Sequence, residues 1–189
     1  HTKFAFMGVL KQVVRDYRKV EKHIYALILA EFCVKLVDSA FFILLNYYLK
    51  TKELTDGQIG PLISNRYLAI LFLAFPLGFF IKGRRLRPFF FISAIGMPLV
   101  GFFVIQAIDM EWWGLVRIGL FLFGTCFVFL NIGGLPYIML NAKKETHSEG
   151  ITLYYQTFGV SFFIVGLFNY LLHTLSPEVF TEKRVLEIF

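Results

Sequence analysis

The chain has 189 residues, of which 57% are hydrophobic, 19% aromatic and only 17% charged, and its formal net charge is +6 at pH 7. A soluble domain of this size needs more polar surface to cover itself, so the composition excludes a soluble globular protein. It favours an all-α polytopic membrane protein, because lipid then contacts most of the molecular surface.

Residues 1–22 are basic, and their apolar residues Met7, Leu10, Val14 and Tyr17 recur at helical spacing. This pattern predicts an amphipathic helix that lies on the cytoplasmic surface of the membrane. A disordered basic leader is the alternative.

Five apolar segments follow, each close to the ~20 residues that a helix needs to cross ~30 Å of hydrocarbon. Such long runs without alternation exclude strands, and the short connections favour antiparallel neighbours. We therefore expect a transmembrane helical bundle over residues 23–176, with helices near residues 24–49, 59–81, 89–108, 113–140 and 151–175.

The first of these segments carries three ionisable residues, Glu31, Lys35 and Asp38, within about two helical turns. At the centre of a span each costs ~2.5–3.5 kcal/mol, whereas each Leu, Ile, Phe or Val returns only ~0.3–0.6 kcal/mol. The segment must therefore be stabilised by pairing and by facing away from lipid. At about 100° per residue the three side chains share one narrow face, which Asn46 continues.

The spacing allows Glu31 to pair with Lys35 (i,i+4) and Lys35 with Asp38 (i,i+3). If all three ionise, one negative charge remains. It calls for a proton, a bound cation or an arginine from another helix, for which Arg66 and Arg117 are the candidates. Two interpretations stay open. The cluster is either purely architectural or part of a wet cavity that contacts a solute or coupling ion, and intramembrane ionisable residues favour the cavity.

Two more polar residues lie inside apolar segments, Asn131 in the fourth and Gln156 in the fifth. Gln156 either lines a cavity or bonds across helices, while Gly159 and Gly166 permit close helix approach. We assign the solute and ion pathway to Glu31, Lys35, Asp38, Asn46, Arg66, Arg117, Asn131 and Gln156.

The basic residues favour one side of the membrane. Only Lys50, Lys52, Lys183 and Arg184 fall on the side opposite the N-terminus, so the positive-inside rule predicts a cytoplasmic N-terminus. The basic clusters are not interleaved with aromatic residues, so nucleic acid is not an expected partner. The other side holds Lys3, Lys11, Arg15, Arg18, Lys19, Lys22, Lys82, Arg84, Arg85, Arg87, Lys143 and Lys144.

No residues form a recognisable catalytic constellation. His23, His147 and His173 fall at different depths, and no Cys/His group has zinc spacing. We predict no enzyme activity, no cofactor and no metal site.

The stretch "ELTDGQIGPLIS", followed by an apolar helix and "PLGFFIKGRRLRP", resembles the start of a major facilitator superfamily transporter. In that family the loop after the second helix reads G-x-x-x-D-R/K-x-G-R-R. Gly78 matches the first glycine, and Gly83, Arg84 and Arg85 match the closing G-R-R. Lys82 stands where the motif has its aspartate, which normally supplies an inner-gate salt bridge.

This resemblance covers residues 24–175 and implies helices one to five of twelve, in which the first and fourth line the central cavity and the third lies outside. Residues 177–189 would form an extracytoplasmic tail or a loop leading to a missing sixth helix. The implied function is that of the N-terminal part of a secondary active transporter in the cytoplasmic (inner) membrane of a bacterium. It would move a small polar solute, a sugar or an organic anion, by alternating access.

"NYYLKTKELTDGQIGPLISNRYLAI" and "GRRLRPFFFISAIGMPL" are similar to the glycoside–pentoside–hexuronide branch, the melibiose-permease-like cation symporters. There a charged pair in the first helix meets the sugar, which corresponds to the region of Lys35 and Asp38. That branch also carries aspartates for the cation after the arginine of the second helix, whereas residues 67–69 after Arg66 are "YLA". Proton coupling through Glu31 or Asp38 is therefore favoured over sodium coupling.

The expected partners are the lipid bilayer, the solute and its coupling ion, and the C-terminal half of the same transporter or another protein chain. Alternating access needs two halves, so we expect the chain to be a piece of a longer transporter or to act with a partner. The alternative function is a non-transporting membrane scaffold or partner subunit with a major-facilitator-like bundle, which the altered loop motif supports.

Overall fold

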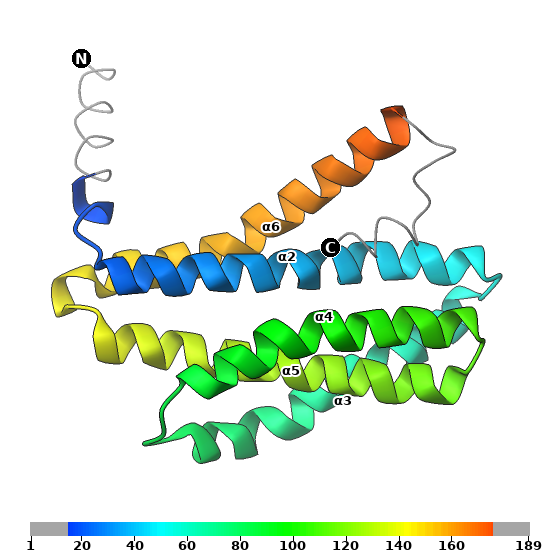
Figure 1. Cartoon of the computed structure of the whole chain (residues 1–189), viewed down its shortest axis with the longest axis horizontal. Helices are drawn as coiled ribbons and strands as arrows, with labels where there is room; N and C mark the ends of the chain where they lie inside the picture. The colour runs from blue at the N-terminus through cyan, green and yellow to red at the C-terminus, as the bar shows by residue number, and fades with distance from the viewer. Residues whose placement is uncertain (1–14, 176–189) are drawn as a thin grey trace.

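The computed structural model describes residues 15–175 (Figure 1). This part of the chain is helical and contains no strand, which confirms the all-α prediction for the described residues. The amphipathic helix predicted over residues 1–22 lies mostly, and the tail predicted over residues 177–189 wholly, outside them. The helices are α2 (Lys22–Thr51), α3 (Asp56–Ile81), α4 (Arg87–Asp109), α5 (Trp113–Asn141), the short 3-10 helix η1 (Lys144–Thr146) and α6 (His147–Leu175).

Four of these helices are long and apolar enough to cross a membrane, as in an integral membrane protein. They are α3, α4, α5 and the segment Lys144–Leu171, which contains most of α6. α2 is as long as they are, with 30 residues, but Glu31, Lys35 and Asp38 set its composition apart. The long helices begin and end within a few residues of the segments expected from the sequence.

Two helices, α5 and α2, make most of the contacts between helices. Figure 1 shows α2, α4 and α6 running in one direction and α3 and α5 in the other. α5 packs closely against α3 and α4, and α2 packs against α6 and α4. Phe41 of α2 stacks on Phe123 of α5, with ring centroids 4.3 Å apart, within the largest apolar cluster. α6 lies beside α2 through its first half and then diverges from it (Figure 1).

The close approach of α3 and α5 depends on Gly124. A Cβ atom added there would collide with the backbone carbonyl of Arg66 and approach Ala69 Cβ at 3.0 Å. A backbone carbonyl cannot rotate away as a side chain can. We expect Gly124→Ala to force the helices apart and to lower the free energy of unfolding by about 1–3 kcal/mol, measured by unfolding in detergent.

Gly159 of α6 is the matched control, because a Cβ atom there would meet nothing within 4 Å. Gly159→Ala should stabilise the helix by about 0.5–1 kcal/mol. Equal losses in the two variants would contradict the packing at Gly124. The sequence-based expectation of close helix approach at Gly159 and Gly166 is wrong for the described residues, since the space around both is open.

The two ends of the bundle differ in charge. We call the end where α2, α4 and α6 begin the basic end. Its helix termini and connections carry seven basic residues, Lys22, Lys82, Arg84, Arg85, Arg87, Lys143 and Lys144, against the acidic residues Glu21, Glu145 and Glu149. The opposite end carries Lys50 and Lys52 together with Glu53, Asp56, Asp109 and Glu111.

Glu21 fastens the start of α2 to the connection between α5 and α6. Its carboxylate accepts hydrogen bonds from the backbone N–H of Lys143 at 3.2 Å and from the hydroxyl of Thr146 at 3.1 Å. A hydrogen bond from its own backbone N–H, followed by these two, holds the pKa of Glu21 below its ordinary value of 4.5. Glu21 is therefore ionised when it links the start of α2 to the connection between α5 and α6.

Candidate functional site

The charged face of α2 is turned into the protein. Glu31, Lys35 and Asp38 are each no more than 2% exposed. On the same helix, Leu29 and Phe42 are exposed large apolar side chains. The expectation that this face turns inward, to where protein groups can pair with the charges, is therefore confirmed.

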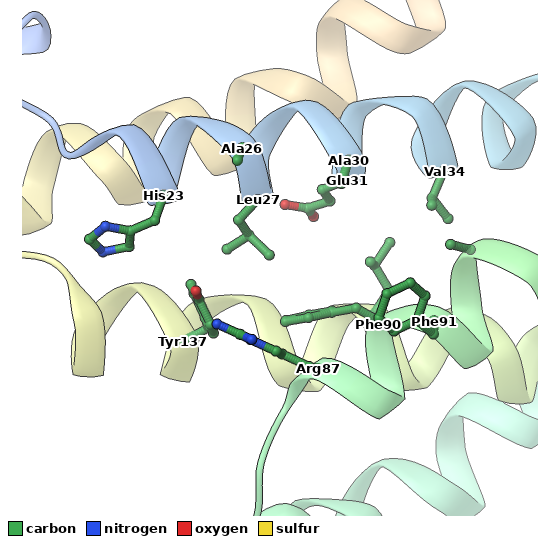
Figure 2. Close-up of a pocket in the computed structure, with 12 residues that line it drawn as sticks. His23, Ala26, Leu27, Ala30, Glu31, Val34, Arg87, Phe90, Phe91 and Tyr137 are labelled. Carbon is green, nitrogen blue, oxygen red and sulfur yellow. The ribbon is translucent and has the colours of Figure 1, made fainter.

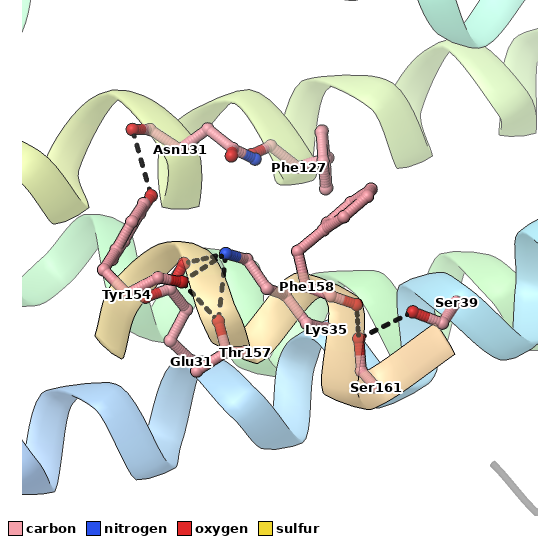
Figure 3. Close-up of polar contacts among 9 residues, drawn as sticks. All are labelled: Glu31, Lys35, Ser39, Phe127, Asn131, Tyr154, Thr157, Phe158 and Ser161. Atoms are coloured by element: carbon pink, nitrogen blue, oxygen red, sulfur yellow. Dashed lines mark hydrogen bonds and ion pairs between the residues drawn. The ribbon is translucent and has the colours of Figure 1, made fainter. Parts of the chain in front are cut away.

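Lys35 ties α2 to α6 (Figure 3). Its Nζ lies 2.8 Å from Oε1 of Glu31. It also donates hydrogen bonds to the backbone carbonyl of Tyr154 at 3.2 Å and to the hydroxyl of Thr157 at 3.1 Å. An ammonium group has three donors, and these three contacts can use all of them. The Tyr154 ring centroid is 4.3 Å from Nζ, which adds a cation–π contact.

The polar contact between α2 and α6 continues one turn further along both helices. Ser39 and Ser161 share a hydrogen bond of 2.9 Å, and both side chains are buried. The bonded residues of the two helices are 119 to 122 positions apart in each case. α2 and α6 therefore run in parallel at a nearly constant offset, joined by a polar seam of Lys35 and Ser39 with Tyr154, Thr157 and Ser161.

Asp38 faces α3 instead, where it pairs with Arg66. Arg66 is only 5% exposed, and its guanidinium lies 4.9 Å and 5.3 Å from the ring centroids of Phe127 and Phe123 of α5. The rings contribute cation–π attraction at this buried position. The expectation that Arg66 supplies a positive charge to the cluster is confirmed.

The pairing differs from the expected one in one respect. No ion pair within 4 Å joins Lys35 to Asp38 in the described part of the chain; each carboxylate has its own cation. Lys35 turns toward the α6 carbonyl and hydroxyl, and Asp38 turns toward α3. The four groups together are neutral if all are ionised, so Arg66 removes the charge that three residues of α2 alone would leave.

A cleft of about 520 Å³ lies between α2, α4 and α5 near the basic end (Figure 2). Glu31 lines it, and its carboxylate interacts there with Lys35 and with the side chain of Tyr154. His23, Arg87 and Tyr137 line the part nearer the basic end (Figure 2). The other walls are apolar: Ala26, Leu27, Ala30, Val34, Phe90, Phe91, Ala94 and Leu130.

Asn131 borders the cluster mainly through its backbone. Its carbonyl accepts a hydrogen bond from the Tyr154 hydroxyl at 3.4 Å. Its side-chain amide donates to the carbonyl of Phe127 in the same helix at 3.0 Å. Asn131 therefore positions Tyr154 through its carbonyl, while its side-chain amide bonds within α5.

Three expected pathway residues lie away from the cluster. Arg117 is exposed and lines a pocket at the opposite end with Lys52, so the expectation that it pairs with the cluster is wrong. Gln156 is exposed and lines a shallow pocket outside the α2–α6 seam. Asn46 is exposed near the end of α2. Each of these residues lies on a helix face that points away from the cluster. The sequence alone does not fix which face an isolated polar residue occupies.

Several site residues were missed from the sequence: Ser39, Arg87, Tyr137, Tyr154, Thr157 and Ser161. A signal for three of them existed, because Tyr154, Thr157 and Ser161 recur at spacings of three and four, which put their hydrogen-bonding groups on one face of a helix. Ser39 could also have been found, since it lies on the turn after Lys35.

The loop motif lies at the basic end. Gly78 is in the exposed last turn of α3, and Gly83 adopts φ 76°, a backbone conformation that favours glycine. The guanidinium of Arg84 stacks 3.8 Å from the ring centroid of Phe80. Among the described residues no ion pair involves Lys82, Arg84 or Arg85, in keeping with a loop that lacks the aspartate of the motif.

Comparisons with family models, curated proteins and solved structures found no match to this chain. The fold and the site define a class: an α-helical protein with four helices able to cross a membrane and a buried, charge-balanced cluster that joins α2 to α3 and α6. The described residues contain no group of three or more His, Cys, Asp or Glu side chains placed to hold a metal ion.

Proposed function

We propose that the chain is the N-terminal bundle of a secondary active transporter of the major facilitator type, with α2 as a fifth membrane span. It moves a small polar solute, a sugar or an organic anion, by alternating access coupled to protons. The observation that carries the proposal is Glu31, a buried carboxylate that pairs with Lys35 and lines the α2–α4–α5 cleft.

Charge balance supports α2 as a span. Glu31 and Asp38 each have a cation within reach, so the cost of placing them in the bilayer is largely offset inside the bundle. The excess of Lys and Arg at the basic end supports a cytoplasmic location for that end and for the N-terminus.

The pairing of the helices supports a bundle built from inverted repeats. α2 packs on α6 and α3 packs on α5, which are the first helix with the fifth and the second with the fourth. If helices one, two and three are exchanged with helices four, five and six, the pair of the first and fifth helices becomes the pair of the fourth and second. Such symmetry is typical of transporters whose halves contain three-helix repeats.

The geometry suggests how proton and solute would be coupled. A proton on Glu31 removes the negative charge that faces Lys35. Lys35 would then have no anionic partner and would keep its neutral ones, the Tyr154 carbonyl and ring and the Thr157 hydroxyl. Its charge becomes available to an anionic or hydroxyl group of the solute.

Uptake by the full-length protein in liposomes tests the proposal. A panel of sugars and organic anions is supplied with and without an inward proton gradient, and we expect the gradient to accelerate uptake of at least one of them. Lys50→Ala, which removes an exposed ion pair with Asp56, serves as a control that should transport normally. A scaffold would instead show no solute flux under any gradient while co-purifying with a partner, and that result would refute the proposal.

A further inference from the structure

A second concave site lies at the basic end, separate from the buried charged cluster. It is a pocket of about 540 Å³ between the α3–α4 connection and the end of α5. Three guanidinium groups line it and no acidic residue does. Its lining residues are Arg84, Arg85, Leu86, Arg87, Tyr137, Leu140 and Asn141. We call it the arginine pocket.

The backbone places these arginines together. Gly83, at φ 76°, turns the chain at the end of α3, and Arg84 N–H closes the turn on the carbonyl of Ile81 at 3.0 Å. Arg84 is held over the ring of Phe80. α4 begins at Arg87, so the positive end of its helix dipole adds to the same region.

The positive charge of the arginine pocket is not balanced by the protein. None of the ion pairs in the described residues includes Arg84, Arg85 or Arg87. The pocket therefore favours an anion, and guanidinium groups match the oxygens of a phosphate in particular. Tyr137 and Asn141 can donate further hydrogen bonds from its α5 wall.

The position of the pocket identifies the source of the phosphate. It lies where α3 ends and α4 begins, which for two helices able to cross a membrane is the level of the lipid headgroups. Large apolar side chains next to it are exposed: Leu140 is 79% exposed, and Phe80 and Phe91 are exposed on the adjoining turns. An acyl chain can cover such surfaces, whereas a soluble anion cannot.

We propose that the arginine pocket binds the phosphate of an anionic phospholipid, whose acyl chains lie along the exposed faces of α3, α4 and α5. Because Arg87 and Tyr137 line both the pocket and the α2–α4–α5 cleft, the headgroup lies beside the mouth of that cleft. This site requires only that the helices cross a membrane, and it does not depend on the proposed transport function.

Lipid titration of the full chain in detergent tests the site, with bound lipids counted by native mass spectrometry. We expect phosphatidylglycerol to bind at least tenfold more tightly than phosphatidylcholine, which corresponds to about 1.4 kcal/mol or more of extra attraction. Arg85→Gln with Arg87→Gln should weaken phosphatidylglycerol binding about thirtyfold, since each basic residue near the surface contributes about 1 kcal/mol. Both residues are exposed, so the fold should persist, which circular dichroism checks.

Lys143→Gln with Lys144→Gln is the matched control. It removes two positive charges from the same end but from outside the pocket. A clearly smaller loss in this variant supports the pocket, and an equal loss would mean diffuse attraction and overturn the proposal. Inorganic phosphate is the third arm: if it displaced phosphatidylglycerol at comparable concentration, the site would be one for free phosphate and not for lipid.

Discussion

Arg66→Met is expected to lower the free energy of unfolding by about 3–5 kcal/mol, because it leaves Asp38 buried without a cation. Asp38 is 2% exposed and no other ion pair in the described residues reaches it. Methionine keeps most of the volume between the Phe123 and Phe127 rings, so lost packing contributes little. Unfolding by increasing SDS in mixed micelles, followed by circular dichroism, measures the change.

The double variant Arg66→Met with Asp38→Leu separates the charge from the packing. Replacing both members of a buried pair by apolar groups is often close to neutral, so much of the lost stability should return. Lys50→Met, which breaks the exposed pair with Asp56, should cost less than about 1 kcal/mol. If the double variant were as unstable as Arg66→Met alone, the pair would not be the source of the effect.

Lys35→Met is expected to have an effect of similar size, about 3–5 kcal/mol, for a related reason. It strands Glu31 and also removes the donor to the Tyr154 carbonyl and the Thr157 hydroxyl. The contact between α2 and α6 should loosen most, because Lys35 is its most connected residue. The same unfolding assay measures the loss, and a cross-link between the two helices should form less efficiently.

Ser39→Ala is the comparison on the same seam. It removes one neutral hydrogen bond, to Ser161, and should cost about 0.5–1.5 kcal/mol. Adding Glu31→Gln to Lys35→Met should recover part of the stability, since the stranded charge is gone. A Lys35→Met variant no less stable than Ser39→Ala would show that the Glu31–Lys35 pair is not buried in the protein.

The helices were predictable because each corresponds to a long apolar run, whose burial away from water contributes a large free energy. Apolar runs of span length define α3, α4 and α5 without reference to any contact. The inward direction of the α2 charges was also predictable, since Glu31, Lys35 and Asp38 share one face that lipid would penalise. For the spans and for the direction of the α2 charges, the free energy of transfer between water, lipid and protein is large enough to determine the structure.

The partners of the charges were less predictable. Arg66 and Arg117 are both single arginines in apolar spans, and only the rotation of each helix brings Arg66 to Asp38 and leaves Arg117 exposed at the opposite end. Lys35 had two carboxylates at equally suitable spacings. The α6 groups at Tyr154 and Thr157 decided its direction, and α6 is distant in the sequence.

The role of Glu31 as the proton-carrying group is the central claim, and one variant tests it most directly. Glu31→Gln keeps the shape of the side chain but cannot bind and release a proton. In liposomes that contain the full-length protein, we expect this variant to lose proton-driven net uptake of the solute while solute exchange at equal concentrations continues. Proton-driven uptake at the rate of the unaltered protein would contradict the claim.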